Sequence, residues 1–193
     1  SAMVADIHGH ILGQGQCYED LRVLCKDIGA RLSGSPEADD AILWGAKTLR
    51  EAGSPEVRMQ TVVVPHWERG AVERAWLRVD GGEREPLRVS ALGGSVGTDS
   101  ILEGEVVMFK DFAPLDEMGP NALEGKIAFF NRAMDPLMIN AGGAYGGAYE
   151  QRSKGAVKAA EHGGRAALVR SLTHALDTFP HTGGMRYADE VNQ

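Results

Sequence analysis

The chain opens with apolar positions that recur at the spacing of an α-helix. Residues 16–28 carry one apolar stripe, and Gly29 follows as a stop. A second helix is predicted over residues 36–52, because Ser35 is a preferred N-cap residue and Pro36 suits the first helical position. Two helices with one-sided apolar stripes need another surface to pack against.

From residue 57 the pattern changes to the period of a β-strand. Val57, Met59, Thr61 and Val63 share one face of a predicted strand that Pro65 ends. Residues 72–79 and 87–89 flank the turn sequence Asp80-Gly81-Gly82, which predicts a hairpin. Residues 104–110 predict a further strand, and residues 115–118 a short turn.

The stretch from residue 124 to residue 171 predicts a crossover unit. An apolar strand at 125–131 precedes a Gly-rich linker and a helix at 149–162, and a second apolar strand follows at 166–170. Strand, helix and strand in this order normally make the two strands parallel. Residues 171–193 show little periodicity.

Together these patterns predict an α+β fold in which a β-rich region, a sandwich or barrel with the crossover unit, follows two helices. We expect a helical segment over residues 1–56 and a second domain over residues 57–193. The unpartnered helices and the aperiodic tail lead us to expect an amino-terminal fragment of a larger enzyme.

Composition and charge exclude several classes of partner. Apolar residues make up 43% and charged residues 24% of the 193 residues, as in an ordinary globular protein. A formal charge of −7 argues against nucleic acid as a partner, because phosphate binding needs a basic surface. The apolar runs are too short to span a membrane, and no charged-then-apolar leader opens the chain.

Metal ligation is the first chemistry to weigh. None of the histidines has helical ligand spacing to another, and no Cys-x-x-Cys occurs, so we expect no zinc site in this chain. His8 and His10 form a pair near the terminus, where we expect an extended segment. Cys17 and Cys25 would lie about 12 Å apart along a helix axis, too far for a disulfide, and are predicted to be buried free thiols.

Phosphate binding and nucleophilic catalysis find little support. The Gly-rich residues 93–98 lead into a strand rather than a helix, so they are interpreted as a loop. Residues 142–147 do precede a helix but lack phosphate-loop spacing, so we expect a flexible loop that faces a ligand. No Gly-x-Ser-x-Gly sequence appears.

Two short stretches have unusual composition. Pro65-His66-Trp67-Glu68-Arg69-Gly70 places an aromatic residue between charged groups, and Pro180-His181-Thr182-Gly183-Gly184 places a histidine in the terminal loop. A turn with a locally satisfied side chain is the favoured interpretation for His66. For His181 a functional role is equally open, because loops on a scaffold often carry function.

With other segments, these stretches resemble a known family. The matching segments, which run from near residue 16 to the end, are 29–35, 65–70, 92–98, 125–127, 152–160, 169–171 and 180–183. In that order they resemble the amino-terminal portion of the zinc-dependent exopeptidases akin to plasma glutamate carboxypeptidase (carboxypeptidase Q).

The resemblance implies a protease-associated domain from about residue 57, beside a separate α/β peptidase domain that holds two zinc ions. The two helices would belong to that peptidase domain, which would be the partner of this chain and would act on short peptides. The family is secreted or periplasmic, and a homodimer is a further expectation. No residue here matches the zinc-binding motifs, so no catalytic or metal residue is assigned.

The residues that we expect at the substrate cleft are Tyr149, Arg152, His181 and Thr182. The motif residues that we expect to be structural are His66, Trp67, Glu68 and Arg69. Two alternatives stay open: a stand-alone module that binds a protein or peptide, and, more weakly, a small metalloenzyme that uses His8, His10 and His181.

Overall fold

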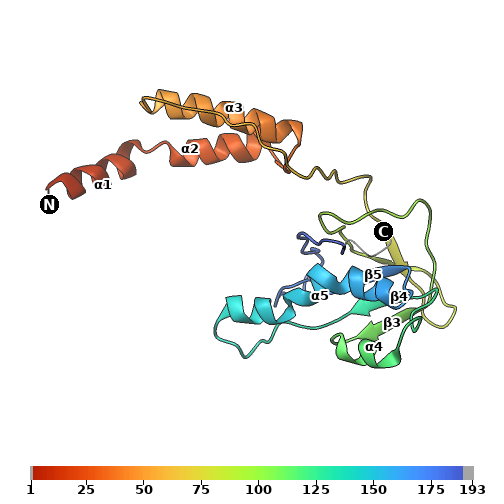
Figure 1. The fold of residues 1–193 in the computed structure, drawn as a ribbon. Coiled ribbons are helices and arrows are strands. Elements are labelled where there is room, and N and C mark those ends of the chain that lie inside the picture. Colours follow the sequence, from red (N-terminus) through yellow and green to blue (C-terminus); the bar gives the residue numbers. More distant parts are fainter. Residues whose placement is uncertain (1, 189–193) are drawn as a thin grey trace. The chain divides into compact units, whose positions relative to one another are not determined.

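The computed structural model describes residues 2–188, and the chain divides into two compact units, Ser1–Glu68 and Arg69–Gln193. Each unit is described by itself, and Figure 1 shows the elements of both. Helices and strands occur together, as expected for the fold class. Among the described residues, no helix is long and apolar enough to cross a membrane.

The first unit contains only helices and irregular segments. Its elements are α1 (Ala2–Gln14), α2 (Cys17–Arg22), the π-helix η1 (Val23–Ile28) and α3 (Pro36–Glu51). The predicted helix over 16–28 is therefore confirmed, although its second half is wound as a π-helix. The predicted cap of α3 is confirmed too, since Ala38 N donates a 3.2 Å hydrogen bond to Ser35 Oγ.

Three predictions for this unit are wrong. His8 and His10 lie within helix α1 rather than on an extended segment. Cys17 and Cys25 are exposed rather than buried. Residues 57–63 form no strand, because no described backbone group pairs with them, and Val63 is fully exposed.

The second unit begins with the predicted hairpin. Strands β1 (Ala75–Leu77) and β2 (Glu85–Leu87) pair antiparallel, with Ala75 opposite Leu87. The turn between them uses left-handed backbone at Asp80, with φ of 48°, and at Gly81, with φ of 75°. The hairpin is confirmed, with shorter strands than the pattern suggests.

A three-stranded parallel sheet forms the centre of the second unit. Strands β3 (Val106–Phe109), β4 (Ile127–Phe130) and β5 (Ala166–Val169) lie in that order. The crossover unit is thus confirmed, with helix α5 (Ala141–Glu161) joining β4 to β5 (Figure 1). The short helix α4 (Ala113–Met118) occupies the place of the predicted turn.

One face of this sheet carries the main core. Phe130 of β4 is completely buried and packs with residues of both helices, Leu115 of α4 and Ala159 of α5. Helix α5 approaches the sheet closely at Gly155, where an added Cβ would lie 2.9 Å from Phe130 Cδ2. The described strands make two small sheets, so the expected β-rich sandwich or barrel is not formed by residues 2–188.

Helix α5 begins earlier than predicted. It starts at Ala141, so the Gly-rich residues 142–147 are helical and the predicted flexible loop is wrong. Asn140 caps the helix by accepting hydrogen bonds from Gly142 N and Gly143 N. Ala144 and Ala148 are buried in a second cluster with Met134 and Leu172, and this packing offsets the low helix propensity of glycine.

Candidate functional site

The candidate site is centred on Arg152, in the middle of helix α5. Only 9% of Arg152 is exposed, and its guanidinium lies 5.2 Å from the ring centroid of Tyr145 and 4.9 Å from that of Tyr149. Arg152 Nη2 donates to the Tyr145 hydroxyl, whereas the buried Nε has no hydrogen-bond partner among the described residues. Buried cations are rarely left without a carboxylate, so the two aromatic rings are the main compensation for this charge.

The guanidinium also lies against the backbone of the terminal segment. A Cβ added to Gly183 would be 2.7 Å from Arg152 Cζ and 3.0 Å from Arg152 Nε. A side chain at position 183 would therefore force the guanidinium to shift from this position.

The segment that contains Gly183 pairs with the loop that follows β2. Gly93 N donates to Gly183 O at 2.7 Å, and Met185 N donates to Gly93 O at 2.8 Å. These two bonds surround a parallel bridge between Gly93 and Gly184. Residues 93–98 are thus a loop, as predicted, and Gly93 in this loop pairs with Gly184 as residues of neighbouring parallel strands do.

Two of the sequence motifs meet at the carbonyl oxygen of Ala91. It accepts hydrogen bonds from Arg69 Nη2 at 3.1 Å and from Thr182 Oγ1 at 2.7 Å. The amide of Ala91 donates to Glu73 Oε1 at 2.8 Å, and Arg69 forms an ion pair with the same carboxylate. The hydrogen bond from the Ala91 amide is the main reason that the pKa of Glu73 is lowered, and Arg69 adds to the effect.

The outer residues of the site are open to solvent. Tyr149 is 39% exposed, and His181 and Thr182 are exposed as well. The backbone of His181 is held, because its N–H donates to Ser171 Oγ at 3.1 Å. Within residues 2–188 the imidazole of His181 has no hydrogen-bond partner.

The structure thus brings together Tyr149, Arg152 and Thr182, with His181 beside Thr182 in the chain. His66 and Glu68 belong to the first unit, where His66 Nε2 lies 2.8 Å from Glu68 Oε1. The ring of His66 also faces Gly34, where an added Cβ would lie 2.9 Å from Nδ1. Trp67, between them in the chain, is half-buried.

Three features of this site were not predicted from the sequence: Glu73, Tyr145, and the contact of Gly183 with the Arg152 guanidinium. Tyr145 lies four residues before Tyr149 and seven before Arg152, which is the spacing of one helix face. That signal was hidden because the helix was predicted to begin at residue 149. Nothing in the sequence indicates the long-range bond between Glu73 and Ala91.

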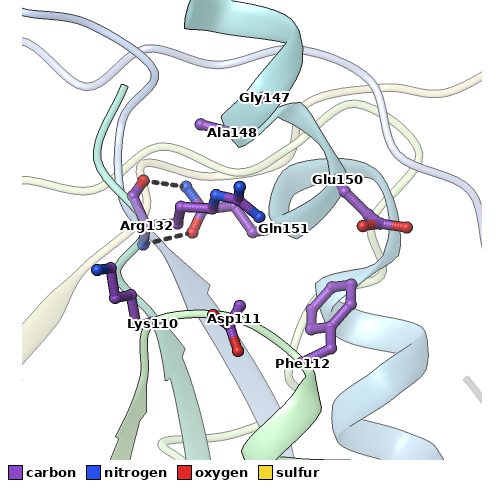
Figure 2. A pocket seen from close by; sticks show the side chains of 8 residues that line it. All are labelled: Lys110, Asp111, Phe112, Arg132, Gly147, Ala148, Glu150 and Gln151. Carbon is purple, nitrogen blue, oxygen red and sulfur yellow. Dashed lines mark hydrogen bonds between the residues drawn. The ribbon is translucent and has the colours of Figure 1, made fainter. Parts of the chain in front are cut away.

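A second polar feature lies at the carboxyl ends of the parallel strands (Figure 2). Gln151 is buried, and its amide group exchanges two 2.8 Å hydrogen bonds with the backbone N–H and C=O of Arg132. The adjoining hollow has a volume of about 20 Å³, which is room for one water molecule. This feature fixes the chain after β4 and is too small for a peptide.

A wider hollow of about 180 Å³ follows β5. Its lining residues are Arg170, Ser171, Thr173, Ala175, Leu176, Asp177 and Phe179. Within residues 2–188, no group of three or more His, Cys, Asp or Glu side chains could hold a metal ion. The described residues therefore do not fit a zinc centre.

Comparisons with known proteins place this geometry in context. No protein family model matches the chain. The chain is 34% identical to carboxypeptidase Q of Xenopus laevis over 189 residues, which is 97% of the chain and 38% of that protein. It is 33% identical to carboxypeptidase Q of Homo sapiens over 179 residues, covering 92% of the chain and 35% of the relative.

A solved structure of a peptidase is also similar to this chain. The crystal structure of a peptidase M28 precursor from Shewanella amazonensis superimposes with a TM-score of 0.81 at 34% sequence identity. The match covers 91% of this chain and 39% of that one. The chain therefore spans less than two fifths of the length of these relatives.

Proposed function

The chain belongs to the carboxypeptidase Q family, and from that premise we propose that it is the non-catalytic amino-terminal region of a zinc exopeptidase acting on short peptides. In this proposal residues from about 57 onward are a protease-associated domain. The catalytic zinc ions, two by family resemblance, belong to a peptidase domain outside this chain. The complete protein would be secreted or periplasmic.

The observation that carries the proposal is the exposed apolar surface of the first unit. The apolar residues of α2 and α3 that are more than half exposed include Leu21, Ile42, Leu43 and Leu49. Among the described residues of this unit, only Ala46 is buried. Apolar surface left open on this scale normally packs against other protein, and a peptidase domain of the same polypeptide would supply it.

The second unit would then act on substrate indirectly. A wall beside the cleft limits the length of the peptide and excludes water from the reacting bond. Tyr149, Arg152, His181 and Thr182 are the side chains that we assign to this wall. Helix α5 carries Tyr149 and Arg152, and the segment with the bridge at Gly184 carries His181 and Thr182.

Comparison of this chain with the complete protein tests the proposal. We expect the complete protein to release amino acids from dipeptides and to retain zinc after dialysis, and this chain alone to do neither. Hydrolysis by this chain alone would contradict the proposal. A complete protein without activity or bound zinc would instead favour a binding module that acts without catalysis.

A further inference from the structure

Arg152 is a buried cation whose compensation is aromatic rather than acidic. No ion pair with a carboxylate joins it among the described residues, and its single hydrogen bond goes to the Tyr145 hydroxyl. Two tyrosine rings lie within 5.2 Å of the guanidinium. A planar guanidinium stacks on such rings, whereas a lysine ammonium does not, so the site is suited to arginine in particular.

The segment 181–185 lies against this guanidinium at Gly183. Gly183 does not have a left-handed φ, so its glycine is not required by backbone conformation. It allows a close approach instead, because a Cβ there would lie 2.7 Å from Arg152 Cζ and 2.8 Å from Nη1 and the guanidinium would have to shift. Arg152 and Gly183 are thus a matched pair from distant parts of the chain.

The same segment has further anchors on both sides of Gly183. The N–H of His181 donates to Ser171 Oγ, and Thr182 Oγ1 donates to Ala91 O. Gly183 O and Met185 N bond to Gly93. The side chain of His181 takes part in none of these bonds and stays exposed.

We propose that Arg152 is a positioning residue that holds the segment 181–185 so that the imidazole of His181 is presented to the peptide substrate. The substrate contact rests on the proposed function, whereas the holding of the segment does not. A fixed backbone with one free imidazole is the arrangement expected for a side chain that contacts a ligand.

The holding role is tested on this chain by hydrogen exchange of the Gly93 and Met185 amides. Arg152→Lys retains the charge but loses the planar stack, and Gly183→Ala pushes the guanidinium off the tyrosines. We expect each to lower the protection of both amides about tenfold, the effect of losing one partly buried cation–π contact. The double variant should lose no more than the single ones.

Matched controls separate this effect from general damage. Arg165→Lys makes the same change at an exposed arginine of the second unit, and Gly146→Ala adds a methyl group where nothing lies within 4 Å. Both should leave the two amides protected. Unchanged protection in Arg152→Lys, or additive losses in the double variant, would overturn the holding role.

The presenting role is tested in the complete enzyme with dipeptides. We expect His181→Ala and Arg152→Lys each to raise KM about tenfold with little change in kcat, since both remove ground-state binding. In a His181→Ala background, Arg152→Lys should have no further effect on KM. A further rise would show that Arg152 does not act through His181.

The two failures are distinguishable. If the complete wild-type protein does not hydrolyse dipeptides, the proposed function is wrong, and the exchange experiment still decides whether Arg152 holds the segment. If the enzyme is active but His181→Ala leaves KM unchanged, the presenting role alone is overturned.

Discussion

At the scale of single residues, the carboxylate of Glu73 joins segments that are far apart in sequence. It accepts a hydrogen bond from the Ala91 amide and pairs with Arg69, and Arg69 in turn donates to the Ala91 carbonyl. Thr182 donates to that same carbonyl. These contacts support a structural role for Arg69. They also show that the hydroxyl group of Thr182, a residue that we assign to the substrate wall, is held by the Ala91 carbonyl.

Glu73→Gln should lower the free energy of unfolding at neutral pH by about 1 kcal/mol, since a partly exposed charge-assisted bond is replaced by a neutral one. The folded-state pKa of Glu73 lies below the usual 4.5. Its stabilisation is therefore fully present above pH 4.5 and is lost as the pH falls through the folded-state pKa. Urea unfolding between pH 3 and pH 7 measures the difference.

Glu83→Gln, at an exposed glutamate of the hairpin turn, is the control. It should leave the pH dependence of unfolding as in the wild type. A Glu73→Gln protein whose stability falls as steeply with acid as that of the wild type would contradict the role assigned to Glu73.

At the scale of elements, helix α5 shows how packing and capping override propensity. Its first turns contain four glycines, each of which costs about 1 kcal/mol relative to alanine. The Asn140 cap and the buried Ala144 and Ala148 support these turns. The helix face formed in this way carries Tyr145 and Tyr149, so the Arg152 site depends on the early start of α5.

Asn140→Ala should destabilise the start of α5 by about 1 kcal/mol, because two amide groups lose their acceptor. Hydrogen exchange of residues 144–147 should become about tenfold faster, while that of residues 155–159 stays as it was. Asn140→Asp keeps the acceptor and should exchange like the wild type. Equal rates in the Ala and Asp variants would refute the cap.

Two glycines of α5 should respond in opposite ways to alanine. At Gly155 the new Cβ meets Phe130 at 2.9 Å and Val169 at 3.3 Å, so overpacking by about 1–3 kcal/mol exceeds the gain in helix propensity. At Gly147 nothing lies within 4 Å, so alanine should stabilise the protein by about 0.5–1 kcal/mol. Thermal unfolding of both variants compares the signs, and a Gly155→Ala protein as stable as Gly147→Ala would contradict the close approach.

The elements that could be predicted from sequence are those with local causes. The hairpin followed from Asp80-Gly81-Gly82, and the crossover unit from two apolar runs around a helical period. The start of α5 was missed although Asn140 is a local capping signal, because the glycines that follow have low helix propensity and part of their support comes from tertiary packing with Leu172. The strand at 57–63 was wrong because a strand needs a neighbour, and alternation alone does not supply one.

The residues of the candidate site also fall into those that could be predicted from the sequence and those that could not. Arg152, Tyr149, His181 and Thr182 were predicted from motifs and resemblance, and the structure brings three of them together around Gly183. Glu73 and Tyr145 were not predicted, because their roles depend on tertiary contacts and on where α5 begins. Sequence patterns located the motifs but not the bonds that join them.

At the scale of the whole molecule, the two units differ in the source of their stability. The second unit contains the core around Phe130 and the cluster around Ala144. The first unit buries Ala46 alone among its described residues, and the stripes of α2 and α3 are predicted to need a partner surface. The resemblance to carboxypeptidase Q is confirmed by the comparisons, and it supports the proposal that a peptidase domain is that partner.

Because local stability follows buried apolar contact, the two units of this chain should open at very different rates. We expect amides of α3 to exchange about a hundredfold faster than those of β4 at neutral pH. The reason is that α3 lacks buried apolar contacts of the kind that surround β4, and the loss of two such contacts, each worth on the order of 1 kcal/mol, is enough for this difference. Brief trypsin treatment should cut at Arg58, within residues 55–68 that lack regular structure, and should leave a resistant product that contains α5. In the complete protein, packing of the same stripes should slow exchange in α3 while rates in β4 change little. If α3 in this chain exchanged as slowly as β4, the first unit would be stable without a partner, and its exposed stripes would no longer support an additional domain.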